Sequence, residues 1–169
     1  MTRDFTVFAA SPSDGDVVGE IHVESWKAAY AGFFEPEFFA EALRRRRHKW
    51  HDVIAASENT VLLAALDGRP LAFSYLGPSP VRQGSAELFG FYGHPDGWGS
   101  GIAKVLMAAS LNKAREGGFQ HVHLWTLRDT VQSRRFYTKC GFTESGTTRA
   151  YDLGDGNPLQ QVEYELMLS

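Results

Sequence analysis

The segment from Trp98 to Ala103 has the composition of an anion-binding turn. It reads WGSGIA and joins a strand pattern to a helix pattern. Small residues at such a junction expose successive backbone N–H groups, and these donors suit a pyrophosphate together with the positive end of the helix dipole. A flexible strand-to-helix turn without a ligand has the same spacing, so spacing alone leaves both readings open. The segment lacks the Gly-Lys-Ser/Thr ending of a P-loop and the G-x-G-x-x-G of a dinucleotide-binding fold.

The elements that must position this turn follow from the hydropathy pattern. We expect strands at 5–9, 60–66, 70–76, 87–93, 121–126, 142–152 and 160–168. Helices are expected to begin near residues 14, 36, 102 and 130 and to end near 32, 51, 117 and 140. Asp67-Gly68 is a strong hairpin signal. The order β-α-α-β-β-β-α-β-α-β-β predicts an α/β (α+β mixed sheet) fold with helices on both faces, in a single domain over 1–169.

Composition and charge exclude several classes of protein. The 169 residues have an ordinary globular composition, and 17 basic against 20 acidic side chains give a net charge of −3. Nucleic acid is therefore not expected as a partner, and we read the Arg44–Arg47 run as a solvated helix end. The lone Cys140 excludes an internal disulfide and a cysteine-built zinc site. With no bilayer-length apolar run and no signal-peptide core, we expect a cytoplasmic protein without membrane contact.

Three segments in this order resemble the GNAT superfamily of acetyl-CoA-dependent N-acetyltransferases: AELFGFYGHP, WGSGIA and LWTLRDTVQSRRFYTKCGF. SWKAAYAGFF near the N-terminus and VEYEL near the C-terminus also look like that family, so the resemblance covers nearly the whole chain. It implies a GNAT-like fold and transfer of an acetyl group from acetyl-CoA, the acyl-donor cosubstrate, directly to a primary amine. It implies no metal. Family members often pair through their terminal strands, so a homodimer is also expected.

The resemblance also implies which residues bind the cofactor. The family loop Gln/Arg-x-x-Gly-x-Gly/Ala falls on residues 98–103, where Gly101 and Ala103 match and Trp98 replaces the usual Gln or Arg. Thr130 stands where the family keeps an Asn that touches the cofactor. The implied cofactor-binding residues are Phe91, Tyr92, Gly93, Trp98, Gly99, Ser100, Gly101, Ile102, Ala103, Thr130 and Phe136.

Amide formation from a thioester needs a neutral amine, a polarised carbonyl and a protonated leaving thiolate. Tyr137 is the candidate general acid, because a tyrosine at this family position lies near the thiol; a packing role is the alternative. We expect Phe136 and Cys140 to face the sheet and Tyr137 to be turned from them by about 100°. Glu87 is the candidate base, with an exposed strand-start carboxylate as the alternative. Backbone N–H groups freed where strand 91–93 splays from its neighbour would polarise the carbonyl.

The acceptor side of the site has the weakest signal in the sequence. Trp26 and Tyr30 lie on one stripe of the first expected helix. In the resembling family this helix forms a wall of the acceptor pocket, which implies that both residues bind the substrate. Aromatic residues at this spacing more often belong to the core, which is the alternative for Trp26. His121 and His123 alternate onto one strand face, and without a third ligand nearby we read them as structural or surface residues. A CoA-binding sensor module that has lost turnover is the competing function. The identity of the amine remains open.

Overall fold

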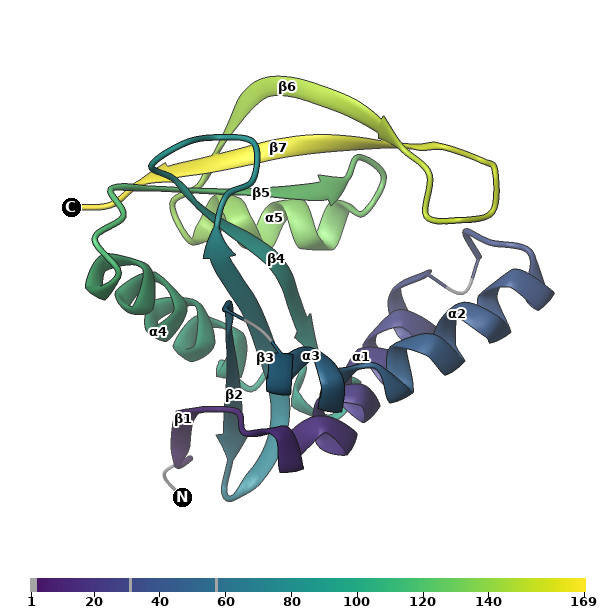
Figure 1. Cartoon of the computed structure of the whole chain (residues 1–169), viewed down its shortest axis with the longest axis horizontal. Helices are drawn as coiled ribbons and strands as arrows, with labels where there is room; N and C mark the ends of the chain where they lie inside the picture. The colour runs from purple at the N-terminus through teal and green to yellow at the C-terminus, as the bar shows by residue number, and fades with distance from the viewer. Residues whose placement is uncertain (1–2, 31, 57) are drawn as a thin grey trace. The chain divides into compact units, whose positions relative to one another are not determined.

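The computed structural model describes residues 3–30, 32–56 and 58–169 and contains a mixed seven-stranded sheet (Figure 1). Along the chain the elements are β1 (Phe5–Ala9), a 3-10 helix (Pro12–Asp14), α1 (Gly15–Tyr30), α2 (Pro36–His48), α3 (Trp50–Ala56), β2 (Thr60–Leu66), β3 (Arg69–Pro78), β4 (Ala86–Gly93), a second 3-10 helix (Pro95–Gly97), α4 (Ile102–Glu116), β5 (His121–Leu127), α5 (Val131–Lys139), β6 (Thr143–Tyr151) and β7 (Leu159–Met167). The strand order is β1-β2-β3-β4-β5-β7-β6, which confirms the predicted fold class.

The chain divides into two compact units. The first contains the described residues up to Leu76 together with Gly90–Ser110, and the second contains Gly77–Phe89 together with Leu111–Ser169. Both units therefore include part of β4 and part of α4. Within the described residues, none of the helices has the length and apolar character needed to cross a membrane.

In the first unit, β1, β2 and β3 form an antiparallel meander. The predicted hairpin at Asp67-Gly68 is confirmed, since these residues have φ of 51° and 85° and connect Leu66 directly to its partner Arg69. Two successive positive φ values are the mark of a type I′ turn, which matches the twist of the flanking strands.

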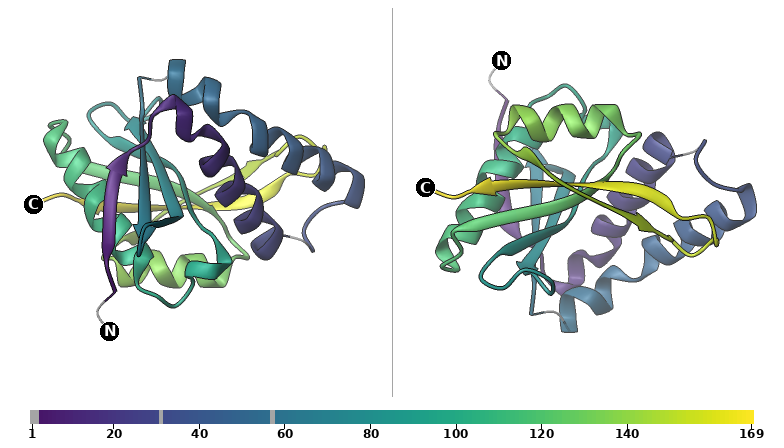
Figure 2. Two further views of the ribbon diagram at one scale, coloured as in Figure 1. Left: turned by 90° about the horizontal axis from the view of Figure 1, so that it is seen from below. Right: turned by 90° about the horizontal axis from the view of Figure 1, so that it is seen from above.

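α1 and α3 share a core with β2 and β3, while α2 packs against α1, and Figure 2 shows α1 and α2 side by side. The sequence predicts one helix that ends near residue 51, whereas the structure has α2 ending at His48 and α3 running from Trp50 to Ala56, with Lys49 between them still at right-handed helical angles. The Trp50 ring is buried beside Phe73, and its Nε1 donates a hydrogen bond to His22 Nδ1 at 3.0 Å. Val18 on α1 belongs to the same core.

In the second unit, β7 lies between β5 and β6 and is antiparallel to both, as Figures 1 and 2 show. The start of β4 runs parallel to β5, with Ala86 opposite Val122 and Glu87 opposite His123. This register sets Glu87 beside His123. The β6–β7 register shifts between Glu144 and Thr148, where Gly146 has a φ of 89°.

Candidate active site

The glycine turn, residues 98–103, lies wholly in the first unit at the entrance to α4. Gly99 and Gly101 have φ of 77° and 93°, a region that L side chains rarely adopt. Among the described residues, a Cβ on Gly99 would meet nothing within 4 Å, and one on Gly101 would meet only the Phe5 ring at 3.8 Å. The backbone path therefore needs both glycines, and the space over them allows a ligand to approach closely.

Hydrogen bonds hold the glycine turn in this shape. Ser100 Oγ accepts from the N–H of Ile102 at 3.2 Å, and the Ser100 carbonyl accepts from the Arg3 guanidinium at 2.7 Å. The N–H groups of Ala103 and Lys104 lie in the first turn of α4, where an α-helix offers its donors no internal acceptor. These donors and the helix dipole form an arrangement that can bind an anion.

Trp98 opens the glycine turn and is 49% exposed. Its Nε1 donates to the carbonyl of Gly93 at 3.0 Å, so the ring braces the turn against the end of β4. The indole has a single donor, and this bond occupies it. The side chain at the position of the family's Gln or Arg thus has no donor left for a phosphate.

The end of β4 contributes an aromatic ring to the first unit. Tyr92 packs on His22 and Phe73 with ring centroids 4.5 and 5.4 Å apart, while Phe91 is half-buried. In the β4–β5 register, only Ala86 and Glu87 of β4 are paired with residues of β5. This agrees with strands that separate further along β4. That the N–H groups of 91–93 face a thioester stays a prediction.

Trp26 and Tyr30 are in contact but differ in exposure. Trp26 is 4% exposed, stacks on Phe34 at 5.6 Å, and lies under the Arg46 guanidinium at 3.6 Å from the ring centroid. Tyr30 meets its edge at 4.9 Å and remains half-buried, with a pKa that burial raises. Trp26 is thus a core residue in this structure, and Tyr30 is the better placed of the two to meet a ligand.

Tyr137 is the buried residue of α5, which differs from the expected facing of that helix. It is 8% exposed, and its ring lies 6.0 Å from those of Phe142 and Tyr164, whereas Phe136 and Cys140 are only half-buried. Tyr137 is thus the most deeply buried residue of the helix, where we predicted Phe136 and Cys140. The aromatic packing fixes the ring, which suits either a positioned acid or a packing role.

Thr130 is the N-cap residue of α5, where the sequence allows either Asp129 or Thr130. Its hydroxyl does not cap the helix but donates to the carbonyl of Leu127 at 2.7 Å. Thr126 Oγ1 lies 3.4 Å from the same hydroxyl. The hydroxyl of Thr130 is thus engaged within its own turn.

Glu87 is buried, so the reading of an exposed strand-start carboxylate is wrong. The residue is 9% exposed, and its Oε1 lies 3.4 Å from His123 Nε2. Burial raises the pKa of Glu87, the positive charge of Arg149 opposes that rise, and the negative charge of Glu163 adds to it. A carboxyl with a raised pKa in a dry setting is a suitable general base near neutral pH.

Two groups that the sequence did not indicate as site residues, His123 and Glu163, surround Glu87. His123 is fully buried, and its Nδ1 lies 2.9 Å from Glu163 Oε2 on the neighbouring strand. Glu163 is directly opposite Trp125 in the β5–β7 register, and His123 is its diagonal neighbour on the same face. The alternation of acidic residues in VEYEL was the available signal, but it gains meaning only once the register is known.

Metal binding was considered for His121 and His123. The part of the chain that the structure describes holds no group of three or more His, Cys, Asp or Glu side chains arranged for a metal ion. His121 Nε2 instead contacts Glu165 Oε1 at 3.1 Å.

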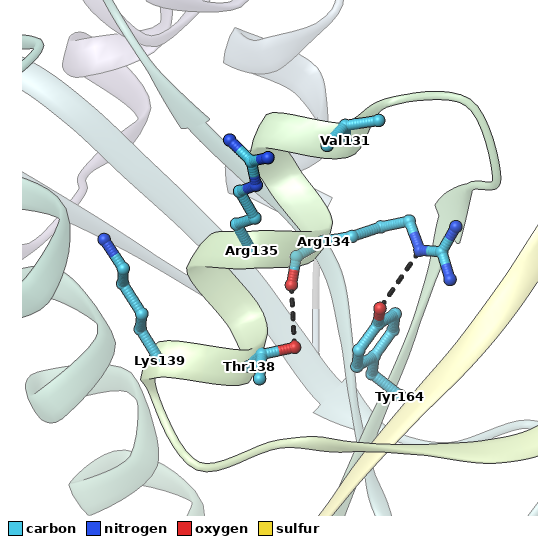
Figure 3. Close-up of a pocket in the computed structure, with 6 residues that line it drawn as sticks. All are labelled: Val131, Arg134, Arg135, Thr138, Lys139 and Tyr164. Atoms are coloured by element: carbon cyan, nitrogen blue, oxygen red, sulfur yellow. Dashed lines mark hydrogen bonds between the residues drawn. The ribbon is translucent and has the colours of Figure 1, made fainter.

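A hollow of about 420 Å³ lies along α5 in the second unit (Figure 3). Arg134 Nε donates to the hydroxyl of Tyr164 at 3.1 Å, and Arg134 also pairs with Glu144. Figure 3 shows Arg135 and Lys139 extending from the opposite side of the helix. The hollow is thus basic. Its lining residues are Val131, Arg134, Arg135, Thr138, Lys139 and Tyr164.

A comparison with protein-family models matches residues 20–142 to the acetyltransferase (GNAT) family. A search of curated proteins found no significant match.

Solved structures with the same fold cover nearly the whole chain. A PaiA N-acetyltransferase from Thermoplasma acidophilum in complex with coenzyme A has a TM-score of 0.77 and 24% identity, over 97% of this chain and 99% of that one. YncA from Salmonella typhimurium with acetyl-CoA has a TM-score of 0.69 and 18% identity, over 98% of this chain and 94% of that one. The ribosomal-protein-S18-alanine N-acetyltransferase from Escherichia coli has a TM-score of 0.67 and 18% identity, over 98% of this chain and 95% of that one. At these identities the likeness shows the fold alone.

Proposed function

The chain belongs to the acetyltransferase (GNAT) family, and we propose that it transfers the acetyl group of acetyl-CoA directly to a primary amine of a small molecule or peptide. The observation that carries the proposal is the glycine turn. Its two positive-φ glycines, the open space over them and the first-turn donors of α4 form a cradle suited to a pyrophosphate. Two structural neighbours are complexes with CoA or acetyl-CoA, which supports the choice of donor.

In this proposal Glu87 accepts a proton from the acceptor's ammonium group. A lysine-type amine has a pKa of about 10.4 and is almost wholly cationic at neutral pH, so a base is needed to free its lone pair. The neutral amine then attacks the thioester carbonyl, the C–S bond breaks, and Tyr137 gives its proton to the departing thiolate. The second proton that leaves the nitrogen as the amide forms restores the Tyr137 hydroxyl, so the products are an amide, a thiol and one proton held by Glu87. Tyr137 belongs to the second unit and the glycine turn to the first, so their placement beside one acetyl-CoA is part of the proposal.

A CoA-binding sensor without turnover is the second candidate. The indole N–H of Trp98 and the hydroxyl proton of Thr130 are both engaged within the protein, so two side-chain contacts expected in the family are weakened. The buried Glu87 favours the enzyme, because a carboxyl with a raised pKa is suited to accept a proton from an ammonium group, a step that CoA binding alone does not require.

Thiol release from acetyl-CoA across a panel of amines separates the two candidates. The panel is spermidine, kanamycin, a peptide that begins with alanine and an N-blocked lysine peptide, with each product identified by its mass. An enzyme is expected to release thiol in step with one acetylated amine. Tight CoA binding by calorimetry with no acetylated product would favour the sensor, and absence of CoA binding would reject both.

Assembly and location are separate proposals. A homodimer through the terminal strands and a cytoplasmic location remain our expectations. Light scattering during size-exclusion chromatography tests the first, and cell fractionation tests the second.

A further inference from the structure

A buried imidazole flanked by two carboxylates lies in the second unit. His123 is 0% exposed, with Nε2 3.4 Å from Glu87 Oε1 and Nδ1 2.9 Å from Glu163 Oε2. Among the described residues no acceptor takes a well-aligned hydrogen bond from Nδ1, so the close approach of Glu163 is an ion-pair contact. Such a contact strengthens when the ring becomes an imidazolium, because Coulomb attraction needs no alignment.

Neighbouring groups hold this triad in place. Ser79 Oγ lies 2.7 Å from His123 Nε2 while it accepts from the N–H groups of Val81 and Arg82, so in the neutral state its hydroxyl donates to Nε2. Ser145 Oγ donates to Glu163 Oε1 at 2.6 Å. The ring is thus fixed with a lone pair toward Ser79 and Glu87, the side on which a proton would arrive.

The formal charges around the triad of Glu87, His123 and Glu163 favour the uptake of one proton. The ionisable groups that face it come from a loop and from β4, β5, β6 and β7; they are Arg82, Glu87, His121, His123, Arg149, Glu163 and Glu165. Three carboxylates face two guanidinium groups, so a single proton on a neutral imidazole balances the cluster.

Burial shifts the pKa values of Glu87 and His123 in opposite directions, each toward the ordinary value of the other. It raises the pKa of Glu87 and lowers the pKa of His123, and the charge of Glu163 partly restores the latter. In water the two side chains differ by about two pKa units. A smaller difference makes transfer between them easier in both directions.

We propose that His123 is a positioning residue that acts through Glu87, taking over the proton that Glu87 removes from the acceptor ammonium while Glu163 holds the resulting imidazolium. This inference rests on the proposed acetyltransferase function. Acetylation of an ammonium group by a thioester yields an amide, a thiol and one released proton. Glu87 takes that proton first, His123 Nε2 receives it, and Glu87 returns to its carboxylate form. The imidazolium loses the proton to water after the products leave.

Titration of the histidines by NMR tests the coupling without any acceptor. His123→Gln identifies the His123 signal among the six histidines. Glu87→Gln and Glu163→Gln are each expected to lower the apparent pKa of His123, because each removes a negative charge beside the imidazolium. Glu116→Gln, which removes an exposed carboxylate of the same unit that pairs with Lys113 outside the cluster, is the control and should leave the pKa of His123 unchanged. A His123 titration that ignores both Glu87→Gln and Glu163→Gln would overturn the proposal.

Kinetics with the amine that the panel identifies tests the role. We expect His123→Gln to lower kcat about 10-fold or more with little change in KM, and we expect free imidazole at fixed pH and ionic strength to restore part of the rate. The wild type and His121→Gln, a change two residues along the same strand, should not respond to imidazole. The relay would be contradicted if His123→Gln had the same kcat as the wild type, or if its kcat were lowered and imidazole did not raise it.

Two comparisons keep the test decisive. If Glu87→Gln lowers kcat and His123→Gln does not, the relay fails while the proposed function stands; if neither lowers it, the base assignment fails as well. Should His123→Gln not fold, Glu163→Gln takes its place, with a lower kcat and a lower His123 pKa expected. No change in either would overturn the proposal.

Discussion

At the scale of single residues, the chemistry assigned to Glu87 depends on its burial. If it is the base, Glu87→Gln keeps the shape of the side chain and abolishes its basicity. We expect the loss of kcat/KM to be largest near neutral pH and to shrink as the pH approaches the pKa of the acceptor, where free amine needs no base. A pH–rate profile of both proteins measures this.

The raised pKa of Glu87 sets the acid side of that profile. Because the base must be ionised, wild-type kcat/KM should begin to fall at a higher pH than an ordinary glutamate would give, and this limb should be missing in Glu87→Gln. With a lysine-type acceptor, a mutant-to-wild-type ratio that stays constant across pH would show that Glu87 is a bystander.

Tyr137→Phe removes one hydroxyl from a ring that aromatic contacts hold in place. If Tyr137 is the acid, turnover should fall about 10²-fold or more while CoA affinity stays nearly unchanged. Steady-state kinetics and calorimetry measure the two quantities. Full turnover on the true acceptor would leave Tyr137 as a packing residue; Phe142→Leu, which alters the same contacts without touching the hydroxyl, is the control.

Gly101→Glu adds bulk, strain and a negative charge to the glycine turn. We expect CoA affinity to fall about 10-fold or more, since repulsion of a phosphate by about 1.4 kcal/mol already gives that factor. Gly118→Glu is the control, because Gly118 has a similar φ of 86° and open space but lies beyond the other end of α4. Unchanged CoA affinity in Gly101→Glu would refute the phosphate assignment.

At the scale of elements, Gly19 sets how closely α1 approaches α2. A Cβ on Gly19 would lie 2.1 Å from the carbonyl oxygen of Arg47, a backbone atom that cannot turn aside. Gly19→Ala should therefore lower stability by about 1–3 kcal/mol and Tm by several degrees, although alanine is the better helix former. A Cβ on Gly32 would meet no atom of the residues that the structure describes within 4 Å, so Gly32→Ala should leave Tm nearly unchanged. Thermal melts followed by circular dichroism compare the two; an equal Tm would mean that the helices separate at little cost.

Local signals predicted the elements well where the cause is local. Asp67-Gly68 fixes its hairpin through the backbone preferences of two residues. The boundary between α2 and α3 had no local signal, and the hydrogen bond of Trp50 to His22 joins residues 28 positions apart on different helices. The burial of Glu87 likewise depends on strand register, which brings His123 and Glu163 to it from distant parts of the chain. The glycine turn could be located because its glycines are needed for its own backbone path.

At the scale of the whole molecule, His22 links stability to pH. Its pKa falls to about 2, first because burial disfavours the cation and then because Lys49 and Arg46 repel it. The unfolded chain takes up a proton near pH 6.5 and the folded chain does not, so stability is full above that pH and declines below it. The decline from this residue should be about 1.4 kcal/mol per pH unit below pH 6.

Urea unfolding between pH 7 and 5 checks this decline. His22→Gln should be less stable at pH 7, because Trp50 Nε1 donates to the ring that is lost, but it should show a shallower dependence on pH. Equal slopes for the two proteins would mean that His22 does not titrate on unfolding.

Trp98 gives the protein an optical signal at the glycine turn. Of the four tryptophans, Trp26 and Trp50 are buried and Trp125 is half-buried, whereas Trp98 is half open to water. Its indole should therefore dominate the long-wavelength edge of the fluorescence spectrum. A molecule that settles on residues 99–103 would cover or quench this ring before any chemistry takes place. The tryptophan emission of an unlabelled sample can thus report occupancy of the glycine turn in real time. Trp98→Phe, which lacks this indole, is the control for emission from the other tryptophans.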